Sequence, residues 1–323
     1  MSRIDGAAFP VAGVCAASVS NHDAGTGCTV IVCPEGATGA VDVRGGAPAT
    51  RETDLLRPEE TVGKLHCVVL SGGSAYGLAA ACGAAEELER RGLGLDVGVG
   101  FVPIVSSACV FDLACGSPDV RPGIAEGALA VARALDEDGR ELEAGNHGAG
   151  CGCTVGKLRG PAHAMKGGLG RATTRSEGLV CCAISAVNAF GNVVDPADGS
   201  PVAGTLSDDG HPLDLAESLA APSDHVPFLR TNTTVSCVVT NALLTKAQAT
   251  KVAQISADAY AHAIRPTHTT NDGDTIFVMA TGEVEATVDQ VGMLATSALE
   301  EAIVDGVRSA EGAYGFPAAR DLS

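Results

Sequence analysis

Short apolar runs rich in β-branched residues recur along this chain, and glycine-rich turns or helical stretches separate them. Leu65–Leu70 and Leu179–Val187 are typical of buried strands, because apolar residues dominate both segments. Helical spacing follows in Ala75–Arg91 and Pro122–Asp136, and a capping box at Thr245–Gln248 begins a further helix. A mixture of strands and helices in this order predicts a layered α/β or α+β domain.

Further segments extend this pattern. Thr233–Leu244 and Thr275–Ala280 are expected to be strands, and the second of them follows a tight Asp-Gly-Asp turn. Val97–Leu113 is expected to be a buried strand that is broken at Pro103. Between about residues 207 and 232 the chain is acidic, interrupted by proline and only weakly periodic, which predicts a flexible, exposed linker.

The composition excludes several classes of partner. The 323 residues carry 21 basic and 39 acidic side chains, and the resulting net charge of −18 repels phosphate backbones and anionic lipid. We therefore expect neither a nucleic acid nor a membrane as partner. The twelve cysteines lie mostly within apolar runs and the N-terminus lacks a secretory pattern, so we expect reduced thiols and a cytoplasmic location.

The common catalytic motifs do not occur in the sequence. It contains no Gly-x-Ser-x-Gly and no His-Glu-x-x-His, and Gly98–Pro103 fails as a dinucleotide fingerprint. His262 and His268 flank a helix end and are interpreted as structural residues, as isolated histidines most often are. From its spacing alone, the segment Asp272–Asp274 is interpreted as a turn rather than as part of a calcium loop.

The junction before Thr233 offers a different kind of nucleophile. If the chain is cut there, the new terminus carries both a hydroxyl and an α-amine, and part of that amine is neutral near pH 7 because its reference pKa is about 7.7–8.0. The amine can then act as the base for its own hydroxyl, so that no histidine is required. Two adjacent threonines at the start of a strand are also explained by β-propensity alone.

Seven motifs extend over nearly the whole chain. They are VDVRGGAPATRETDLL (Val41–Leu56), LSGGSAYGL (Leu70–Leu78), VPIVSSACVFDL (Val102–Leu113), TVGKL (Thr154–Leu158), KGGLG (Lys166–Gly170), NTT (Asn232–Thr234) and RPTHTTNDGDTIF (Arg265–Phe277). In this order they resemble the self-processing N-terminal-nucleophile hydrolases. That family includes the DmpA-type D-aminopeptidases, the β-peptidyl aminopeptidases and the nylon-oligomer endo-hydrolase.

The resemblance implies a fold and a maturation step. The fold is a layered α/β/β/α sandwich, of the type shared with ornithine acetyltransferase, in a single domain spanning residues 1–323. The precursor cuts itself between Asn232 and Thr233, which gives a large chain 1–232 and a small chain 233–323. Members of the family assemble as oligomers of cleaved heterodimers, so we expect a tetramer or a larger assembly.

The resemblance also implies which residues carry out the reaction. Thr233 matches the nucleophile of both self-cleavage and substrate hydrolysis. Asp272 and Asp274 match an acidic pair that orients and titrates the amine and hydroxyl of the nucleophile.

Three further positions match supporting residues of the family. Lys157 matches a lysine that holds the aspartate charge and polarises the hydroxyl. Asn188 and Tyr76 match donors to the oxyanion. Without the resemblance, Lys157 is a surface charge, Asn188 is a turn residue and Tyr76 is a packing residue. No cofactor or metal is expected, because the chain itself supplies nucleophile, base and oxyanion donors.

Several positions depart from the family pattern. The cut follows asparagine and precedes threonine, as in the nylon-oligomer branch, whereas the aminopeptidase branch often carries Gly-Ser. Cys151 and Cys153 stand in the loop before Lys157, where small residues are expected, and Asn241 stands where many relatives have aspartate. These departures affect the expected substrate more than the reaction type.

The leading hypothesis is a self-cleaving amide hydrolase that acts as an aminopeptidase or amidase on peptides or ω-amino-acid amides. Acyl transfer of the ornithine-acetyltransferase type is a second class, although its cut usually follows alanine. An uncleaved, non-catalytic binding protein is the third, and it predicts that Thr233 stays within an intact chain. The residues leave open the preference for D-, L- or β-amino acids, and exo- or endo-action.

Overall fold

The computed structural model describes residues 9–136, 142–220 and 232–322, and nine strands of this part of the chain form one long mixed sheet. Most neighbouring strands are antiparallel, but β14 and β16 in the middle of the sheet are parallel, and so are β4 and β7 near one end. Along the sheet the order is β10 (Leu169–Ser176), β11 (Leu179–Asn188), β14 (Thr233–Ala242), β16 (Thr275–Val284), β2 (Thr26–Val43), β4 (Leu65–Ser71), β7 (Val105–Cys109) and β3 (Thr50–Arg51), with β1 (Cys15–Asn21) also paired to β2.

The sheet is folded into two layers, and the 18-residue strand β2 runs through both of them. Its first part pairs with β1 and β4, and its last part pairs with β16. The register with β4 shifts between Val32 and Ala37, where the strand passes from one layer to the other. Residues from both layers then share one core, in which Val68 of β4 lies in the same cluster as Val235 and Cys237 of β14.

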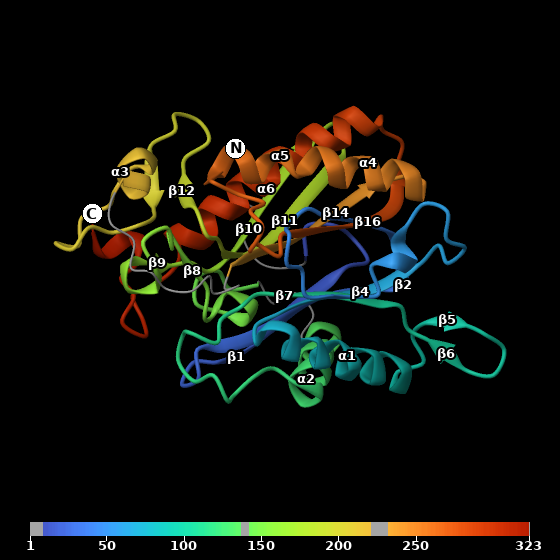
Figure 1. Cartoon of the computed structure of the whole chain (residues 1–323). Coiled ribbons are helices and arrows are strands. Elements are labelled where there is room, and N and C mark those ends of the chain that lie inside the picture. The colour runs from blue at the N-terminus through green and yellow to red at the C-terminus, as the bar shows by residue number, and fades with distance from the viewer. Residues whose placement is uncertain (1–8, 137–141, 221–231, 323) are drawn as a thin grey trace.

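Helices cover both outer faces of the two layers (Figure 1). On one side, α1 (Ala79–Arg90) and α2 (Ile124–Asp136) pack against β1, β2 and β4. On the other side, α4 (Lys246–Ser256), α5 (Asp258–Ala263) and α6 (Val288–Arg308) enclose a second helix–sheet core with β10, β11 and β14. The order is helix, sheet, sheet, helix, which confirms the α/β/β/α sandwich.

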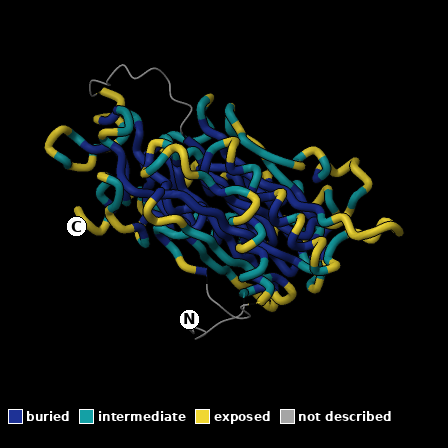
Figure 2. Tube along the Cα trace, turned by 90° about the horizontal axis from the view of Figure 1, so that it is seen from below, coloured by how far each residue is buried: buried dark blue, intermediate teal, exposed yellow. Residues whose placement is uncertain are grey.

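Strand β14 shows how the sequence specifies these layers. Val235, Cys237 and Val239 face the core between the sheets, whereas Val238 and Ala242 face the helices. Both faces of the strand are buried, so small polar residues such as Ser236 and Thr240 are enclosed together with its valines. Buried residues fill the interior of the molecule, and exposed residues lie mainly in the loops around it (Figure 2).

Short elements surround this framework. The capping box at Thr245 begins α4, as the sequence predicts. None of the described helices is long and apolar enough to cross a bilayer. The remaining elements are β5 (Leu95–Asp96), β6 (Phe101–Val102), β8 (Thr154–Val155), β9 (Met165–Lys166), β12 (Asn192–Val194), β13 (Pro201–Ala203), β15 (Ile264–Arg265), α3 (Leu215–Ala220) and short 3-10 turns that include η2 (Ser74–Leu78).

The prediction for Val97–Leu113 was wrong in its first half. β7 is buried as expected, but the residues before Pro103 form the protruding hairpin β5–β6, where Val99 is 97% exposed. Glycines at positions 92, 94 and 98 adopt positive φ angles and turn the chain outward.

The first part of the predicted linker is structured. A bridge joins Leu206 to Pro212, and α3 follows it with Ser218 buried. Residues 221–231, the rest of the predicted linker, lie outside the described residues.

Candidate active site

The ends of four strands meet at one edge of the sheet. The antiparallel register pairs Asn188, the last residue of β11, with Thr233, the first residue of β14. Asn232 forms a bridge with Asp272, and the start of β16 pairs with the end of β2. Directly opposed residues point to the same face with their Cβ atoms about 4.5–5.5 Å apart. The fold therefore places Asn188, Thr233 and the acidic turn next to one another.

The hydroxyl of Thr233 lies against the preceding peptide. Its Oγ1 contacts the carbonyl oxygen of Asn232. The N–H of Gly273 donates to the same carbonyl oxygen at 3.1 Å. Thr233 is buried, with 5% of its surface exposed. A hydroxyl beside a carbonyl that a backbone donor polarises is the arrangement needed for acyl transfer.

Four donors converge on the carboxylate of Asp274. Its Oδ1 accepts from the N–H of Thr234 at 2.8 Å, so the carboxylate is tied to the residue after Thr233. Its Oδ2 accepts from the hydroxyl of Thr267 at 3.0 Å, the N–H of His268 at 3.0 Å and the Nδ1 of His268 at 2.9 Å. Sequence analysis did not place Thr267 or His268 in the site.

Asp272 is the second carboxylate of the acidic turn. Its Oδ2 accepts from the N–H of Thr269 at 2.7 Å, whereas its Oδ1 is buried and has no hydrogen-bond partner among the described residues. Burial raises the pKa of Asp272, and the charge of Asp274 raises it further. Two carboxylates that share a buried site are expected to behave in this way.

Lys157 is held by Asn188. Its Nζ donates to Oδ1 of Asn188 at 2.9 Å and to the backbone oxygen of the same residue at 3.1 Å. Burial lowers the pKa of Lys157 to about 7, although the nearby acidic groups of Cys153 and Asp272 act in the opposite direction. An appreciable fraction of Lys157 is therefore an uncharged amine near neutral pH, and such an amine can accept a proton.

The side-chain amide of Asn188 also makes two bonds away from Lys157. Its Oδ1 accepts from the N–H of Thr154 at 2.9 Å, and its Nδ2 donates to the carbonyl oxygen of Phe111 at 3.0 Å. The sequence predicts this amide as an oxyanion donor. In the structure it fixes the position of Lys157 and donates to the backbone.

Within the described part of the chain, no hydrogen bond joins Tyr76 to this group. This residue belongs to η2, its surface is 63% exposed, and the guanidinium of Arg121 lies 4.0 Å from the centroid of its ring. The structure brings together the other predicted residues, which are Thr233, Asp272, Asp274, Lys157 and Asn188.

The segment after β2 is a part of the site that sequence reasoning missed. The N–H groups of Arg44 and Gly45 donate to the carbonyl oxygen of Asp274 at 3.0 and 3.3 Å, and the N–H of Ala47 donates to that of Asp272 at 2.8 Å. A side chain at Gly45 would collide with the backbone of the acidic turn. The glycine pair within VDVRGGAPAT was the sequence signal for this close approach.

Cys151 and Cys153 belong to a buried loop beside Lys157. The Nζ of Lys166 donates to their carbonyl oxygens at 2.9 and 2.8 Å and thereby holds the loop. Burial raises the pKa of both thiols, whereas a reactive cysteine needs a lowered one. The surroundings of Cys151 and Cys153 are therefore those of structural thiols and not of reactive ones.

Asn241 lies near the far end of β14, about 26 Å from Thr233 at roughly 3.3 Å per residue. Its side chain accepts from the N–H of Val180 at 2.8 Å and donates to the carbonyl oxygen of Gly178 at 2.9 Å. The departure from aspartate at this position thus concerns the turn before β11 and not the site.

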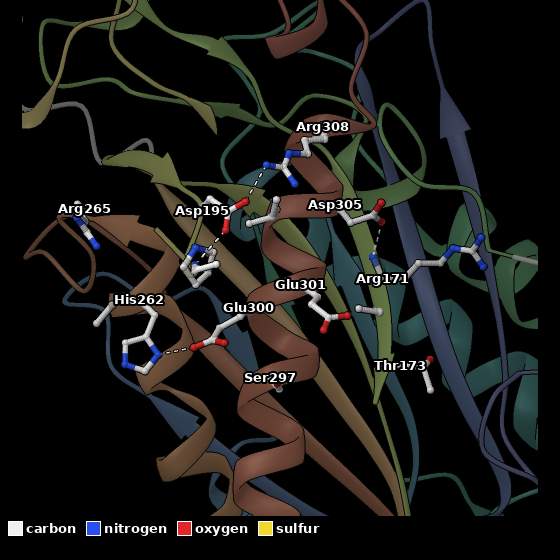
Figure 3. Close-up of a pocket in the computed structure, with 15 residues that line it drawn as sticks. Arg171, Thr173, Asp195, His262, Arg265, Ser297, Glu300, Glu301, Asp305 and Arg308 are labelled. Atoms are coloured by element: carbon white, nitrogen blue, oxygen red, sulfur yellow. Dashed lines mark hydrogen bonds and ion pairs between the residues drawn. The ribbon is translucent and has the colours of Figure 1, made fainter. Parts of the chain in front are cut away.

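An open depression of about 1270 Å³ lies on the outer side of α6 (Figure 3). Charged side chains of both signs line it, and within it His262 pairs with Glu300 and Arg308 pairs with Asp195 at 2.9 Å. Its lining does not include the residues around Thr233. Within the described ranges, no group of three or more His, Cys, Asp and Glu side chains is arranged to hold a metal ion.

Solved structures show the same fold at low sequence identity. A β-aminopeptidase of Burkholderia sp. matches with a TM-score of 0.65 and 21% identity, over 93% of this chain and 85% of that chain. The L-aminopeptidase D-Ala-esterase/amidase of Ochrobactrum anthropi, described as a variant of the Ntn hydrolase fold, matches with a TM-score of 0.67 and 18% identity, over 94% and 86% of the two chains.

Curated relatives are more similar in sequence. An uncharacterized aminopeptidase of Mycobacterium tuberculosis is 39% identical, over 92% of this chain and 89% of its own length. The 6-aminohexanoate-oligomer endohydrolase of Paenarthrobacter ureafaciens is 32% identical, over 86% of this chain and 75% of its own length. The family model described as peptidase family S58 matches residues 9–320. With nearly its whole length matched, the chain belongs to peptidase family S58.

Proposed function

We propose that this chain is an amide hydrolase whose nucleophile, Thr233, becomes an N-terminus when the Asn232–Thr233 bond is cut by the protein itself. The observation that carries the proposal is the contact between Thr233 Oγ1 and the Asn232 carbonyl oxygen, together with the Gly273 N–H that donates to this oxygen at 3.1 Å. The same hydroxyl and the same donor serve both self-cleavage and hydrolysis of a substrate.

Self-cleavage begins with attack of Thr233 Oγ1 on the carbonyl carbon of Asn232. The hydroxyl proton passes to a base, and the uncharged fraction of Lys157 supplies one because its pKa lies at about 7. The C–N bond then breaks, the Thr233 nitrogen takes up a proton, and an ester joins Asn232 to Oγ1. Water hydrolyses this ester and leaves the Asn232 carboxylate and a free α-amine on Thr233.

After the cut, the α-amine of Thr233 acts as the base for its own hydroxyl. Its reference pKa of about 7.7–8.0 leaves a neutral fraction at physiological pH. We assign Asp272 as the acceptor of a hydrogen bond from the new amine; its bridge with Asn232 and its buried oxygen without a described partner support this. Substrate hydrolysis then repeats the same steps through an acyl ester on Thr233, with water as the final acceptor.

We propose peptides or ω-amino-acid amides as the substrate class. Support comes from the names of relatives, which include aminopeptidases at 39% identity and oligomer endohydrolases at 32% identity. The threonine at the cut favours the oligomer-hydrolase side of this range.

Intact mass under denaturing conditions tests the proposal. The wild-type protein should separate into residues 1–232 and 233–323, with Thr233 as the first residue of the smaller chain. Thr233→Ala should stay intact and inactive, and Thr233→Ser should still cut because it keeps the hydroxyl. A Thr233→Ala protein that hydrolyses amides would refute the mechanism, and an intact wild-type chain would favour a binding protein.

We also propose an assembly and a location for the mature protein. The exposed apolar residues of the β5–β6 hairpin, which include Val97, Val99 and Phe101, support self-association of cleaved heterodimers into a tetramer or larger oligomer. Light scattering coupled to size-exclusion chromatography measures the mass of the assembly and tests this proposal. All twelve cysteines are free thiols, which supports a reducing location such as the cytoplasm.

A further inference from the structure

His268 packs against the acidic turn from the loop that precedes β16. Its Nδ1 lies 2.9 Å from Asp274 Oδ2, and its backbone N–H donates to the same oxygen at 3.0 Å. Its own φ angle is 55°, in the left-handed region that histidine, asparagine and glycine tolerate best. The backbone and the ring of one residue thus both contact one carboxylate oxygen.

Tyr260 packs against one face of the His268 ring. The two rings stack with centroids 5.4 Å apart and planes 24° apart. Tyr260 is fully buried, and its hydroxyl bonds to Ser236 at 2.7 Å and to the carbonyl oxygen of Thr234 at 3.1 Å. The imidazole is therefore held at its edge by the acidic turn and at its face by a side chain that is hydrogen-bonded to β14.

The hydrogen in the His268–Asp274 contact is assigned to the imidazole. Both oxygens of Asp274 already accept from backbone N–H groups, those of Thr234 and His268, so the carboxylate acts as the acceptor. Nδ1 of His268 is then the donor. Its Nε2 is buried without a partner among the described residues, which leaves Nδ1 as the ring atom that acts on the site.

We propose that His268 is a positioning residue for self-cleavage and turnover, which acts through Asp274. The chain of contacts runs from His268 Nδ1 to Asp274 Oδ2, and from Asp274 Oδ1 to the N–H of Thr234. Thr234 directly follows the nucleophile, so the rotation of this carboxylate sets where Thr233 Oγ1 lies relative to the Asn232 carbonyl. The inference rests on the proposed function of Thr233.

Two variants separate the hydrogen bond from the bulk of the ring. His268→Asn places an amide nitrogen where Nδ1 stands and tolerates the positive φ angle, whereas His268→Gly tolerates the angle but removes the donor. His262→Asn is the matched control, because His262 is a histidine of the charged depression that pairs with Glu300. All three proteins are compared with the wild type by thermal melting.

The experiment follows intact mass against time after cell-free synthesis, and then turnover of an amino-acid p-nitroanilide by the cut protein. We expect His268→Gly to slow self-cleavage and lower kcat at least tenfold with KM within about twofold, since a displaced nucleophile slows the chemical step more than it weakens binding. His268→Asn should recover most of both rates, and His262→Asn should match the wild type.

Three outcomes would overturn the inference. A His268→Gly protein that cuts and turns over at wild-type rates would overturn it alone. So would a His268→Asn protein that melts like the wild type but is as slow as His268→Gly, because the donor would then not be the active feature. A wild-type chain that stays intact and inactive would overturn the proposed function, and the inference with it.

Discussion

Gly273 is a residue whose substitution would directly displace Thr233, the nucleophile that we propose. It lies between the two aspartates, and its N–H donates to the Asn232 carbonyl oxygen at 3.1 Å. A Cβ at this position would lie 2.8 Å from Thr233 Oγ1 and 3.0 Å from the carbonyl oxygen of Ala47. The φ angle of Gly273 is not in the left-handed region, so the expected effect of Gly273→Ala comes from these contacts and not from backbone strain.

The size of the effect follows from the distances. Ordinary contact begins at 3.4 Å, so the new methyl group and Thr233 Oγ1 must move apart by about 0.6 Å. The carbonyl oxygen of Ala47 and Cγ2 of Thr233 are also close to the new methyl group, at 3.0 and 3.2 Å, so either Thr233 or the backbone of Gly273 must shift. A misplacement of about 1 Å costs about a hundredfold in rate, so we expect self-cleavage of Gly273→Ala to slow by about tenfold to a hundredfold.

The assay is the intact mass of the chain against time, with Gly63→Ala as the matched control. A Cβ at Gly63 meets no atom within 4 Å, so this control should cut at the wild-type rate. A Gly273→Ala protein that melts like the wild type and also cuts at its rate would refute the assignment of Gly273 and Thr233 to one reacting group.

Three further variants test the electrostatics and packing of the site. Burial lowers the pKa of Lys157 from 10.5 to about 7, so between these values the unfolded chain binds more protons than the folded one. The free energy of unfolding should rise with pH across this window, by at most about 1.4 kcal/mol per pH unit, and urea titrations at pH 7–9 should show a smaller rise for Lys157→Met. Asp274→Asn puts an amide nitrogen among four donors. It should cost about 1.5–3 kcal/mol in urea titrations and should slow self-cleavage by mass analysis, whereas unchanged values would contradict the described bonds. Tyr260→Phe removes the hydroxyl that bonds to Ser236 and Thr234. A loss of about 1–3 kcal/mol in the free energy of unfolding is expected, and a loss below the error of the titration would show that these bonds are replaced.

The layered fold could be predicted from the sequence, because buried strands and capped helices leave recognisable patterns in it. Strand β11 carries a nearly continuous apolar run, and the capping box at Thr245 marks where the helix after β14 begins. The exposed hairpin β5–β6 was missed, because Val97–Val102 has the apolar content of a core strand. There the glycines decide the conformation, since positive φ angles turn the chain away from the sheet before its valines can be buried.

The candidate site was predictable only where residue type and motif agreed. The structure brings Thr233, the acidic turn and Lys157 together, as the resemblance implies, and their catalytic roles stay predictions. The contact of His268 with Asp274 was not predicted, since an isolated histidine has no periodicity that reveals its partner. The different environment of Tyr76 could not be predicted either, because exposure depends on packing between distant segments.

The position of β14 within the sheet has a consequence for when the protein can mature in the cell. β14 and β16 lie between β11 and β2, so the small chain would remain paired on both sides by the large chain after the cut. The residues around Thr233 come from segments as far apart as Ala47 and Asp274. A chain still growing on the ribosome lacks the acidic turn and β16 until residues 272–284 have been made, and it cannot assemble the site before then. The maturation that we propose would therefore wait until β16 has folded beside β14, and a partial chain would lack the site that hydrolyses amides.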